Sequence, residues 1–192
     1  QLTLVSSDGS DMAILKRMCG IVGYVGDQQA LGIALDALRR MEYRGYDSAG
    51  IAVVGQGSLD VAKRAGKLQN LEDRIEEIGA ENLAGTTAIG HTRWATHGRP
   101  TDENAHPHMS FDGKAAIVHN GIIENFASLR EELERSGIEM QSETDSEVAA
   151  HLLALAYNEG ETAGDFKESS LSVLRKLEGA FTILLSLIHI SE

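Results

Sequence analysis

The sequence has no surplus of positive charge and no run of lysine and arginine dense enough to follow a nucleic-acid backbone. Its 192 residues contain 17 lysines and arginines against 29 aspartates and glutamates, so the formal net charge is −12. Phosphate groups and anionic membrane surfaces repel a chain of this sign, and we therefore expect no nucleic-acid or membrane partner. The length is typical of one domain with its own hydrophobic core.

Long apolar runs and paired cysteines are also missing. The longest apolar stretch, 180–190, is too short to span a bilayer and is interrupted by Ser186 and His189. The first residues are polar and do not resemble a secretory signal peptide. A single cysteine, Cys19, cannot form an internal disulfide, which fits a reducing compartment. We expect a soluble, cytoplasmic protein.

Internal repeats and low-complexity segments are absent, and the predicted elements mix strands with helices. Strands are predicted at 20–26, 50–54, 59–64, 115–119 and 180–185, and from Thr87 onward; helices are predicted at 29–41, 70–78, 126–136 and 169–179, and from Thr144 onward. Thr144 and Glu147 have the spacing of a helix capping box. The order lacks the regular alternation of a parallel α/β fold, which indicates the α+β class.

The only cysteine occupies an unusual position, directly after a methionine at the start of a predicted strand. A lone cysteine beside Ile21 and Val22 is usually a small buried apolar residue. If translation begins at Met18 and this methionine is removed, however, Cys19 carries a free α-amine. Such an amine has a pKa of about 7.7–8.0, so a useful fraction is neutral near pH 7 and can take the thiol proton. The context therefore favours a nucleophile and its base in one residue.

A segment rich in histidine contains His91, His97, His106 and His108. Histidines beside acidic residues permit a zinc site as one interpretation. No helical pair of histidines is present, however, and the glycine and proline content indicates a loop rather than a rigid ligand frame. We therefore predict no metal and keep zinc as the weaker alternative.

The other interpretation of this segment is a substrate-binding loop. Its Arg93 can hold a carboxylate with the planar fork of its guanidinium group. Trp94, the only tryptophan, can cover the site, although ordinary core packing explains it about as well.

The stretch from Val118 to Gly121 reads Val-His-Asn-Gly, and the Asn-Gly pair predicts a tight turn between a strand and a helix. In that place the side-chain amide of Asn120 and the N–H of Gly121 are adjacent donors that can hold an oxyanion. Asp145, near the start of the next predicted helix, is favoured there by the helix dipole and can equally face a ligand ammonium group.

Six motifs in this order resemble a known family: MCGIVGYVG, LRRMEYRGYDSAGIAVV, GHTRWATHG, NAHPH, VHNGIIENF and SETDSEV. They are similar to the glutaminase domain of the glutamine–fructose-6-phosphate aminotransferases (isomerizing), which belong to the class II, N-terminal-nucleophile amidotransferases. The similarity covers residues 19–183. It implies a four-layer αββα sandwich with the nucleophile at the start of a central strand.

The resemblance also implies roles for the matching residues. Cys19 would be the nucleophile and its α-amine the base, and Asn120 and Gly121 would form the oxyanion hole. Arg93 would bind the α-carboxylate of glutamine and Asp145 its α-ammonium group. The remaining residues would line or shield the pocket: Trp94, Thr96, His97 and His106, with Tyr43, Arg44 and Gly45 close to the cysteine terminus.

The chain departs from the family at both ends. Residues 1–18 precede the nucleophile, and we interpret them as a leader outside the mature domain. Residues 184–192 do not resemble the family's continuation, and we interpret them as a non-native tail on a C-terminally truncated domain. The isomerase domain that binds fructose 6-phosphate would then be missing.

The expected activity is hydrolysis of glutamine to glutamate and ammonia without a cofactor. In the full-length enzyme, which the resemblance implies to be a homo-oligomer, ammonia would convert fructose 6-phosphate to glucosamine 6-phosphate. One alternative is the glutaminase domain of another class II enzyme, of the amidophosphoribosyltransferase type. A second is an inactive glutamine-binding module in which Cys19 stays internal.

Overall fold

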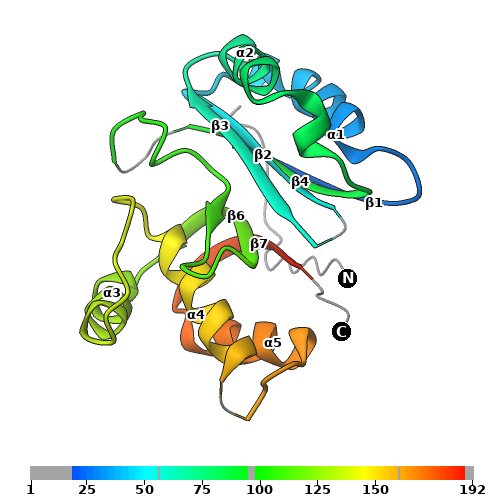
Figure 1. Cartoon of the computed structure of the whole chain (residues 1–192). Helices are drawn as coiled ribbons and strands as arrows, with labels where there is room; N and C mark the ends of the chain where they lie inside the picture. Colours follow the sequence, from blue (N-terminus) through cyan, green and yellow to red (C-terminus); the bar gives the residue numbers. More distant parts are fainter. Residues whose placement is uncertain (1–18, 56, 95–97, 160, 189–192) are drawn as a thin grey trace, which may run out of the picture.

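The computed structural model describes residues 19–55, 57–94, 98–159 and 161–188, and its strands form two sheets that face each other (Figure 1). The strands are β1 (Gly20–Val25), β2 (Ser48–Val54), β3 (Leu59–Ala65), β4 (Thr87–Arg93), β5 (His108–Met109), β6 (Ala115–Ile123) and β7 (Gly179–Leu187). The α-helices are α1 (Ala30–Arg39), α2 (Leu68–Ile78), α3 (Phe126–Arg135), α4 (Ser146–Asn158) and α5 (Phe166–Lys176). Short 3₁₀ helices lie at Glu42–Arg44 and Ala80–Leu83.

The elements form four layers. The first sheet has the order β1-β4-β2-β3 and the second the order β5-β6-β7, and all neighbouring strands are antiparallel. Helices α1 and α2 cover the outer face of the first sheet, and α3, α4 and α5 lie on the outer side of the second (Figure 1). The predicted α+β class and the αββα sandwich are confirmed.

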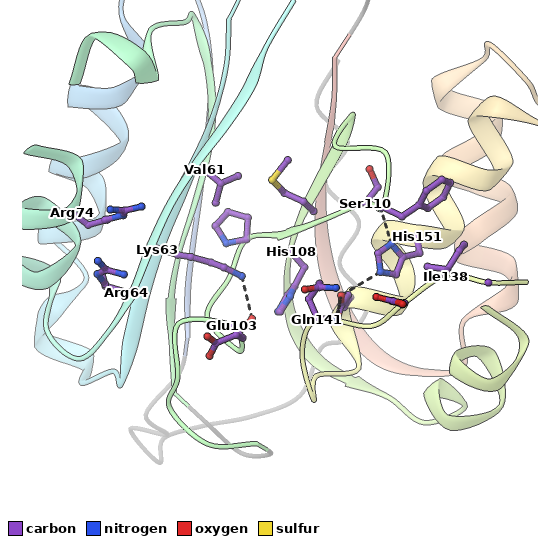
Figure 2. Close-up of a pocket in the computed structure, with 16 residues that line it drawn as sticks. Val61, Lys63, Arg64, Arg74, Glu103, His108, Ser110, Ile138, Gln141 and His151 are labelled. Atoms are coloured by element: carbon purple, nitrogen blue, oxygen red, sulfur yellow. Dashed lines mark hydrogen bonds and ion pairs between the residues drawn. The ribbon is translucent and has the colours of Figure 1, made fainter. Parts of the chain in front are cut away.

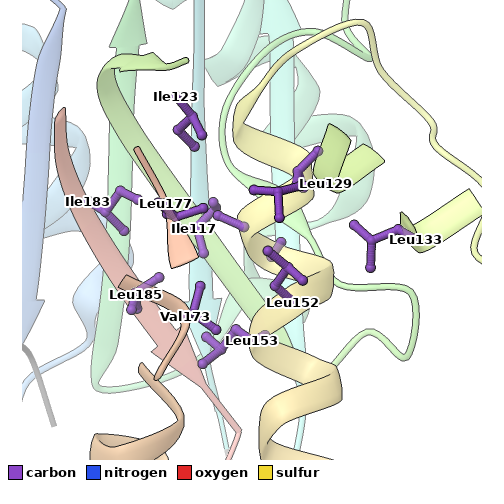
Figure 3. Packing of buried hydrophobic residues seen from close by; sticks show 14 of the residues in the cluster. Ile117, Ile123, Leu129, Leu133, Leu152, Leu153, Val173, Leu177, Ile183 and Leu185 are labelled. Atoms are coloured by element: carbon purple, nitrogen blue, oxygen red, sulfur yellow. The ribbon is translucent and has the colours of Figure 1, made fainter. Parts of the chain in front are cut away.

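Apolar side chains fill each space between layers. Strand β6 contributes to two of these spaces because successive side chains of a strand point to opposite faces. Ile117 and Ile123 pack toward α3, α4 and α5, where they meet Leu153 and Val173 (Figure 3). Val118 points the other way and packs between the two sheets. The alternation fixes which residues of β6 face the first sheet.

The predicted turn at Asn120-Gly121 is wrong, because β6 continues through both residues to Ile123. Gly121 pairs with Phe181 of β7 at a backbone φ of +127°, a conformation that L side chains rarely adopt. A Cβ at this position would lie 2.3 Å from the carbonyl oxygen of Ala180. The glycine therefore allows close approach of two paired strands rather than a chain reversal.

The predicted capping box is also wrong. Helix α4 begins at Ser146, and the Glu147 carboxylate accepts hydrogen bonds from the N–H groups of Gln141 and Ser142, both at 2.7 Å. A capping side chain is found instead at α5, where Asp165 accepts from the N–H of Glu168 at 3.0 Å. The predicted helix over 169–179 ends at Lys176, and residue 179 already begins β7.

Strand β7 extends past the proposed domain limit at 183, and its pairing with β6 continues to Leu187. Leu184, Leu185 and Leu187 are buried. Residues 1–18 and 189–192 lie outside the described residues, so the proposed leader and tail stay predictions. No helix in the described segments is long and apolar enough to span a membrane.

We expect Gly121→Ala to lower the free energy of unfolding by about 1–3 kcal/mol from backbone strain alone, before any clash with β7 is added. Urea denaturation followed by circular dichroism measures the change. Gly32→Ala is the matched control, because Gly32 lies inside α1 with open space around its Cβ position. Alanine there should stabilise by about 0.5–1 kcal/mol. Equal stability of the Gly121 variant and the parent would contradict this account of the strand.

Candidate active site

A cavity of about 520 Å³ opens at one end of the sandwich, where residues from both sheets and from the start of α4 meet. Its walls are Cys19, His91, Arg93, Trp94, Gly98, His106, His119, Asn120, Gly121, Ile122, Phe126, Glu143, Thr144, Asp145 and Ser146. This volume is within the usual range for a small-molecule site.

Cys19 lies immediately before β1 and is partly buried. The N–H of Trp94 donates a hydrogen bond to its Sγ at 3.1 Å. Burial raises the pKa of the Cys19 thiol, against the opposing effect of this hydrogen bond. The thiol is therefore protonated at neutral pH and needs a base before it can act as a nucleophile.

Asn120 connects the two sheets at the cavity. Its side chain points toward the first sheet, where Nδ2 donates to the carbonyl oxygen of Cys19 at 3.0 Å. Its Oδ1 lies 2.7 Å from Nε2 of His91 on β4. A carboxamide nitrogen carries two hydrogens, so one N–H remains for a ligand in the cavity.

The direction of the Gly121 N–H follows from the pairing of β6 with β7. In an antiparallel pair, hydrogen-bonded and non-hydrogen-bonded residues alternate along each strand. Glu124, directly after β6, donates its N–H to Glu178 across the β7 edge at 2.8 Å, whereas the N–H of Ile123 points to the opposite edge and donates to Asp145. Gly121 shares the alternation of Ile123, and its N–H therefore points away from β7. Asn120 and Gly121 both line the cavity, and their role as an oxyanion hole stays a prediction.

Arg93 ends β4, and its guanidinium group borders the cavity although its side chain is only 7% exposed. Nη1 lies 3.8 Å from Oδ1 of Asp47 and 3.4 Å from the carbonyl oxygen of Arg99. Sequence reasoning missed Asp47, whose negative charge also contributes to the raised pKa of the Cys19 thiol. Arg93, the cation proposed from the sequence, therefore lines the cavity.

Asp145 precedes α4, and its carboxylate lies near a backbone donor and a histidine. Oδ2 accepts from the N–H of Ile123 at 2.8 Å, and Oδ1 lies 3.8 Å from Nδ1 of His119. The carboxylate therefore links the start of α4 to β6. A cation and an anion, Arg93 and Asp145, stand in the walls of one cavity.

Four histidines cluster at the cavity, and three of them, His91, His106 and His119, form part of its walls. The ring of His106 lies 4.3 Å from that of His91, 4.6 Å from that of His108 and 6.4 Å from that of His119. Burial lowers the pKa of His91 to about 4 and holds the pKa values of His106 and His108 well below their ordinary range. In the described part of the chain, no group of three or more histidine, cysteine or acidic residues is placed to hold a metal ion.

The remaining predicted residues divide into two groups. Thr96 and His97 lie outside the described residues. Trp94 and His106 line the cavity. A Cβ added to Gly45 would lie 3.3 Å from Cζ3 of Trp94, so the Tyr43–Gly45 segment lies beside this tryptophan.

The motifs gave no role in the site to His119 or Ser146, and they gave His91 only the weaker zinc interpretation. His119 is adjacent to Asn120 and His91 lies two residues before Arg93, but these spacings alone gave no sign of their contacts. Ser146 lies 2.8 Å from Nδ1 of His119 through its Oγ atom, a contact between segments 27 residues apart.

A second cavity, of about 640 Å³, lies between the sheets near Val61, Lys63 and His108 (Figure 2). The lysine in its wall is engaged within the protein, because Lys63 Nζ donates to the carbonyl oxygens of Glu103 and Ala105 at 3.1 and 2.9 Å. It lacks a thiol. The cavity at Cys19 is therefore the stronger candidate for chemistry.

Residues 56–186 match the family described as "Glutamine amidotransferase domain". A protein of Mycobacterium tuberculosis strain CDC 1551, named glutamine–fructose-6-phosphate aminotransferase [isomerizing], is 65% identical over 167 residues, which are 87% of this chain and 27% of that protein. The Aquifex aeolicus protein of the same name is 52% identical over 172 residues, which are 90% of this chain and 28% of that protein. The chain thus spans little more than a quarter of these relatives.

Solved structures give the same picture of the fold. The glutamine phosphoribosylpyrophosphate amidotransferase of B. subtilis is 28% identical with a TM-score of 0.69, covering 87% of this chain and 35% of that one. A structure described as the allosteric regulatory enzyme of purine biosynthesis is 29% identical with a TM-score of 0.70, covering 86% of this chain and 35% of that one.

The buried histidines predict how stability depends on pH. Because His91, His106 and His108 have lowered pKa values in the folded chain, only the unfolded chain takes up their protons as pH falls below about 6.5. The free energy of unfolding should therefore fall between about pH 7 and pH 5, by at most about 1.4 kcal/mol per pH unit for each histidine. For His91 the loss continues down to its folded pKa of about 4.

Urea denaturation over a pH series tests this, and His106→Gln should show a shallower dependence than the parent. Burial alone would raise the pKa of Glu147, but hydrogen bonds from His151 and Ser142 lower it to about 2. The contribution of this carboxylate to the free energy of unfolding is therefore lost only below the pH range in which the histidines act. A parent whose free energy of unfolding is constant over this range would contradict the buried neutral state of the histidines.

Proposed function

Because this chain belongs to the glutamine amidotransferase domain family, we propose that it hydrolyses the side-chain amide of glutamine to glutamate and ammonia, with Cys19 as the nucleophile. The observation that carries the proposal is the content of one cavity: a thiol, two adjacent N–H donors, a guanidinium group and a carboxylate. This set fits an amino acid whose side-chain carbonyl must be attacked.

The charged groups fit the two ends of a free α-amino acid. Arg93 binds the α-carboxylate through its planar fork, and Asp145 binds the α-ammonium group. With both ends held, the side-chain amide extends toward Cys19. Trp94, Thr96, His97 and His106 complete or shield the pocket in this proposal.

The reaction then has two halves. The Cys19 sulfur attacks the amide carbon, and its proton passes through the α-amine of a terminal Cys19 to the leaving nitrogen, which departs as ammonia. The N–H groups of Asn120 and Gly121 stabilise the oxyanion of each tetrahedral intermediate. Water then attacks the thioester carbon, the thiol is released, and glutamate leaves. No cofactor takes part.

The similarity to the relatives supports a place for this chemistry in a longer protein. We propose that the ammonia there converts fructose 6-phosphate to glucosamine 6-phosphate on a separate isomerase domain, in a cytoplasmic homo-oligomer. Identities of 52–65% to the relatives of that name favour this over the phosphoribosyl type, of which the B. subtilis structure is 28% identical.

The first test concerns the terminal amine. With Met18 attached, the Cys19 nitrogen is an amide and cannot act as a base, and we expect the chain as printed to be nearly inactive. A form that starts at Met18, from which aminopeptidase exposes Cys19, should hydrolyse glutamine about 10²–10⁴ times faster, the usual effect of a positioned base. Every described helix and strand lies within residues 20–187 and is retained in this form.

Intact-mass analysis identifies the terminus of each preparation, and glutamate release measures its activity. Cys19→Ala in the Met18 form is the control and should release none. Full activity in a preparation whose mass includes residues 1–18 would refute the terminal-amine mechanism. A processed form that binds glutamine without releasing glutamate would instead identify an inactive binding module.

The second test concerns Arg93. A lysine ammonium group does not reproduce a two-point contact with a carboxylate, so Arg93→Lys should lower kcat/KM for glutamine by about 10–100-fold, the loss of roughly 1.5–3 kcal/mol of charged hydrogen bonding. Glutamine analogues without the α-carboxylate should be poor substrates of the parent and lose little more in the variant.

Arg39→Lys is the matched control, because Arg39 is about half exposed on α1 and pairs there with Asp36 and Glu72. It should leave activity unchanged, and thermal unfolding should show that both variants fold. Equal losses for glutamine and for the analogue would overturn the assignment of Arg93 to the carboxylate.

A further inference from the structure

The amide of Asn120 is held at both ends by groups of opposite hydrogen-bonding character. On one side the carbonyl oxygen of Cys19 only accepts, so it requires the Nδ2 end of the amide, at 3.0 Å. On the other side Oδ1 faces His91 Nε2 at 2.7 Å. Oδ1 only accepts, and His91 must therefore donate from Nε2.

The protonation of His91 agrees with this direction. The residue is 1% exposed, and its Nδ1 has no hydrogen-bond partner among the described residues. Because burial lowers its pKa to about 4, the ring is neutral near pH 7 and carries one hydrogen. That hydrogen is on Nε2, which leaves Nδ1 as a bare acceptor. The other tautomer would bury an Nδ1–H without an acceptor, which costs more free energy than leaving the lone pair of Nδ1 unused.

The backbone and the neighbouring ring keep the His91 donor in place. Strand β4 is hydrogen-bonded on both sides, and His91 lies between Ile21 of β1 and Gly50 of β2. Its ring also packs against that of His106 at 4.3 Å. The imidazole cannot follow the amide if the amide turns.

We propose that His91 is a positioning residue, which holds the side chain of Asn120 in the one orientation that presents an N–H to the reacting carbonyl. The torsion of a terminal amide is broad and roughly two-fold, so its two flipped states differ in energy mainly through their partners. Without a donor on Oδ1, the flipped amide would direct its oxygen toward Cys19 and the developing oxyanion. This inference rests on the proposed function and assigns His91 no proton transfer with the substrate.

A double-mutant cycle with Asn120 tests the inference in the form that starts at Met18. His91→Leu removes the donor, and kcat for glutamine should fall about 10–100-fold. This loss should not exceed the loss for Asn120→Ala, which is expected to be about 10²–10³-fold. KM should change by less than about threefold, because the contact matters mainly in the transition state. In His91→Gln the amide N–H can replace Nε2–H, and kcat should recover to within about fivefold of the parent.

The double variant, His91→Leu with Asn120→Ala, should be no slower than Asn120→Ala alone, because His91 then has no amide to position. Losses that multiply would mean that His91 acts independently of Asn120 and would overturn the inference. An unchanged kcat with a raised KM in His91→Leu would overturn it as well.

A measurement without turnover separates this inference from the proposed function. The ring ¹⁵N signals of the full chain near pH 7 should show His91 as the Nε2–H tautomer, and the side-chain N–H signals of Asn120 should shift in His91→Leu and return in His91→Gln. An Nδ1–H tautomer would overturn the inference whether or not glutamine is hydrolysed. A parent with a free Cys19 terminus that releases no glutamate, but has these signals, would refute the proposed function alone.

Discussion

The apolar contact between the two sheets determines the geometry of the candidate site. His91 belongs to the first sheet, Cys19 directly precedes its strand β1, and Asn120 belongs to the second sheet, so their hydrogen bonds depend on the distance between the sheets. Facing sheets pack about 10 Å apart, a distance set by the side chains between them. Here these are mostly of medium size, including Ile89, Val118 and Leu184. A larger layer would separate the thiol from the amide without altering either residue.

Burial also sets the electrostatic character of the site. Burial lowers the pKa values of His91, His106 and His108, so these histidines are neutral near pH 7 although the charges of Arg93 and Asp145 stand in the same cavity walls. A neutral wall does not screen the N–H donors, and charge interactions are stronger there than in water. The net negative charge of the chain therefore does not determine the affinity of the cavity for an anion.

The periodicity of the sequence predicted most elements, because alternating or helical apolar patterns are local properties. It failed at Asn120-Gly121, where the preference of the dipeptide for a turn was overridden by pairing with β7, a strand about 60 residues later. It failed at Glu147 because the carboxylate reaches back to the segment before the helix. Cys19, Arg93 and Asn120 were chosen as candidates from their chemistry, and they line one cavity. The contact between His91 and Asn120 joins two strands from different sheets, which no spacing reveals.

The close contact between Gly121 and β7 limits which substitutions the chain tolerates at this position. The side-chain position of Gly121 is closed by the backbone of β7 and the residue also lines the cavity, so under the proposed function a substitution there affects both folding and the site. A genetic screen for lost activity would recover substitutions at Gly121 and at Asn120 alike. Those at Gly121 would also lower the amount of folded protein in the cell, since a loss of 1–2 kcal/mol changes abundance about several-fold. Second-site suppressors that stabilise the fold elsewhere would rescue part of the Gly121 defect and none of the defect at Asn120.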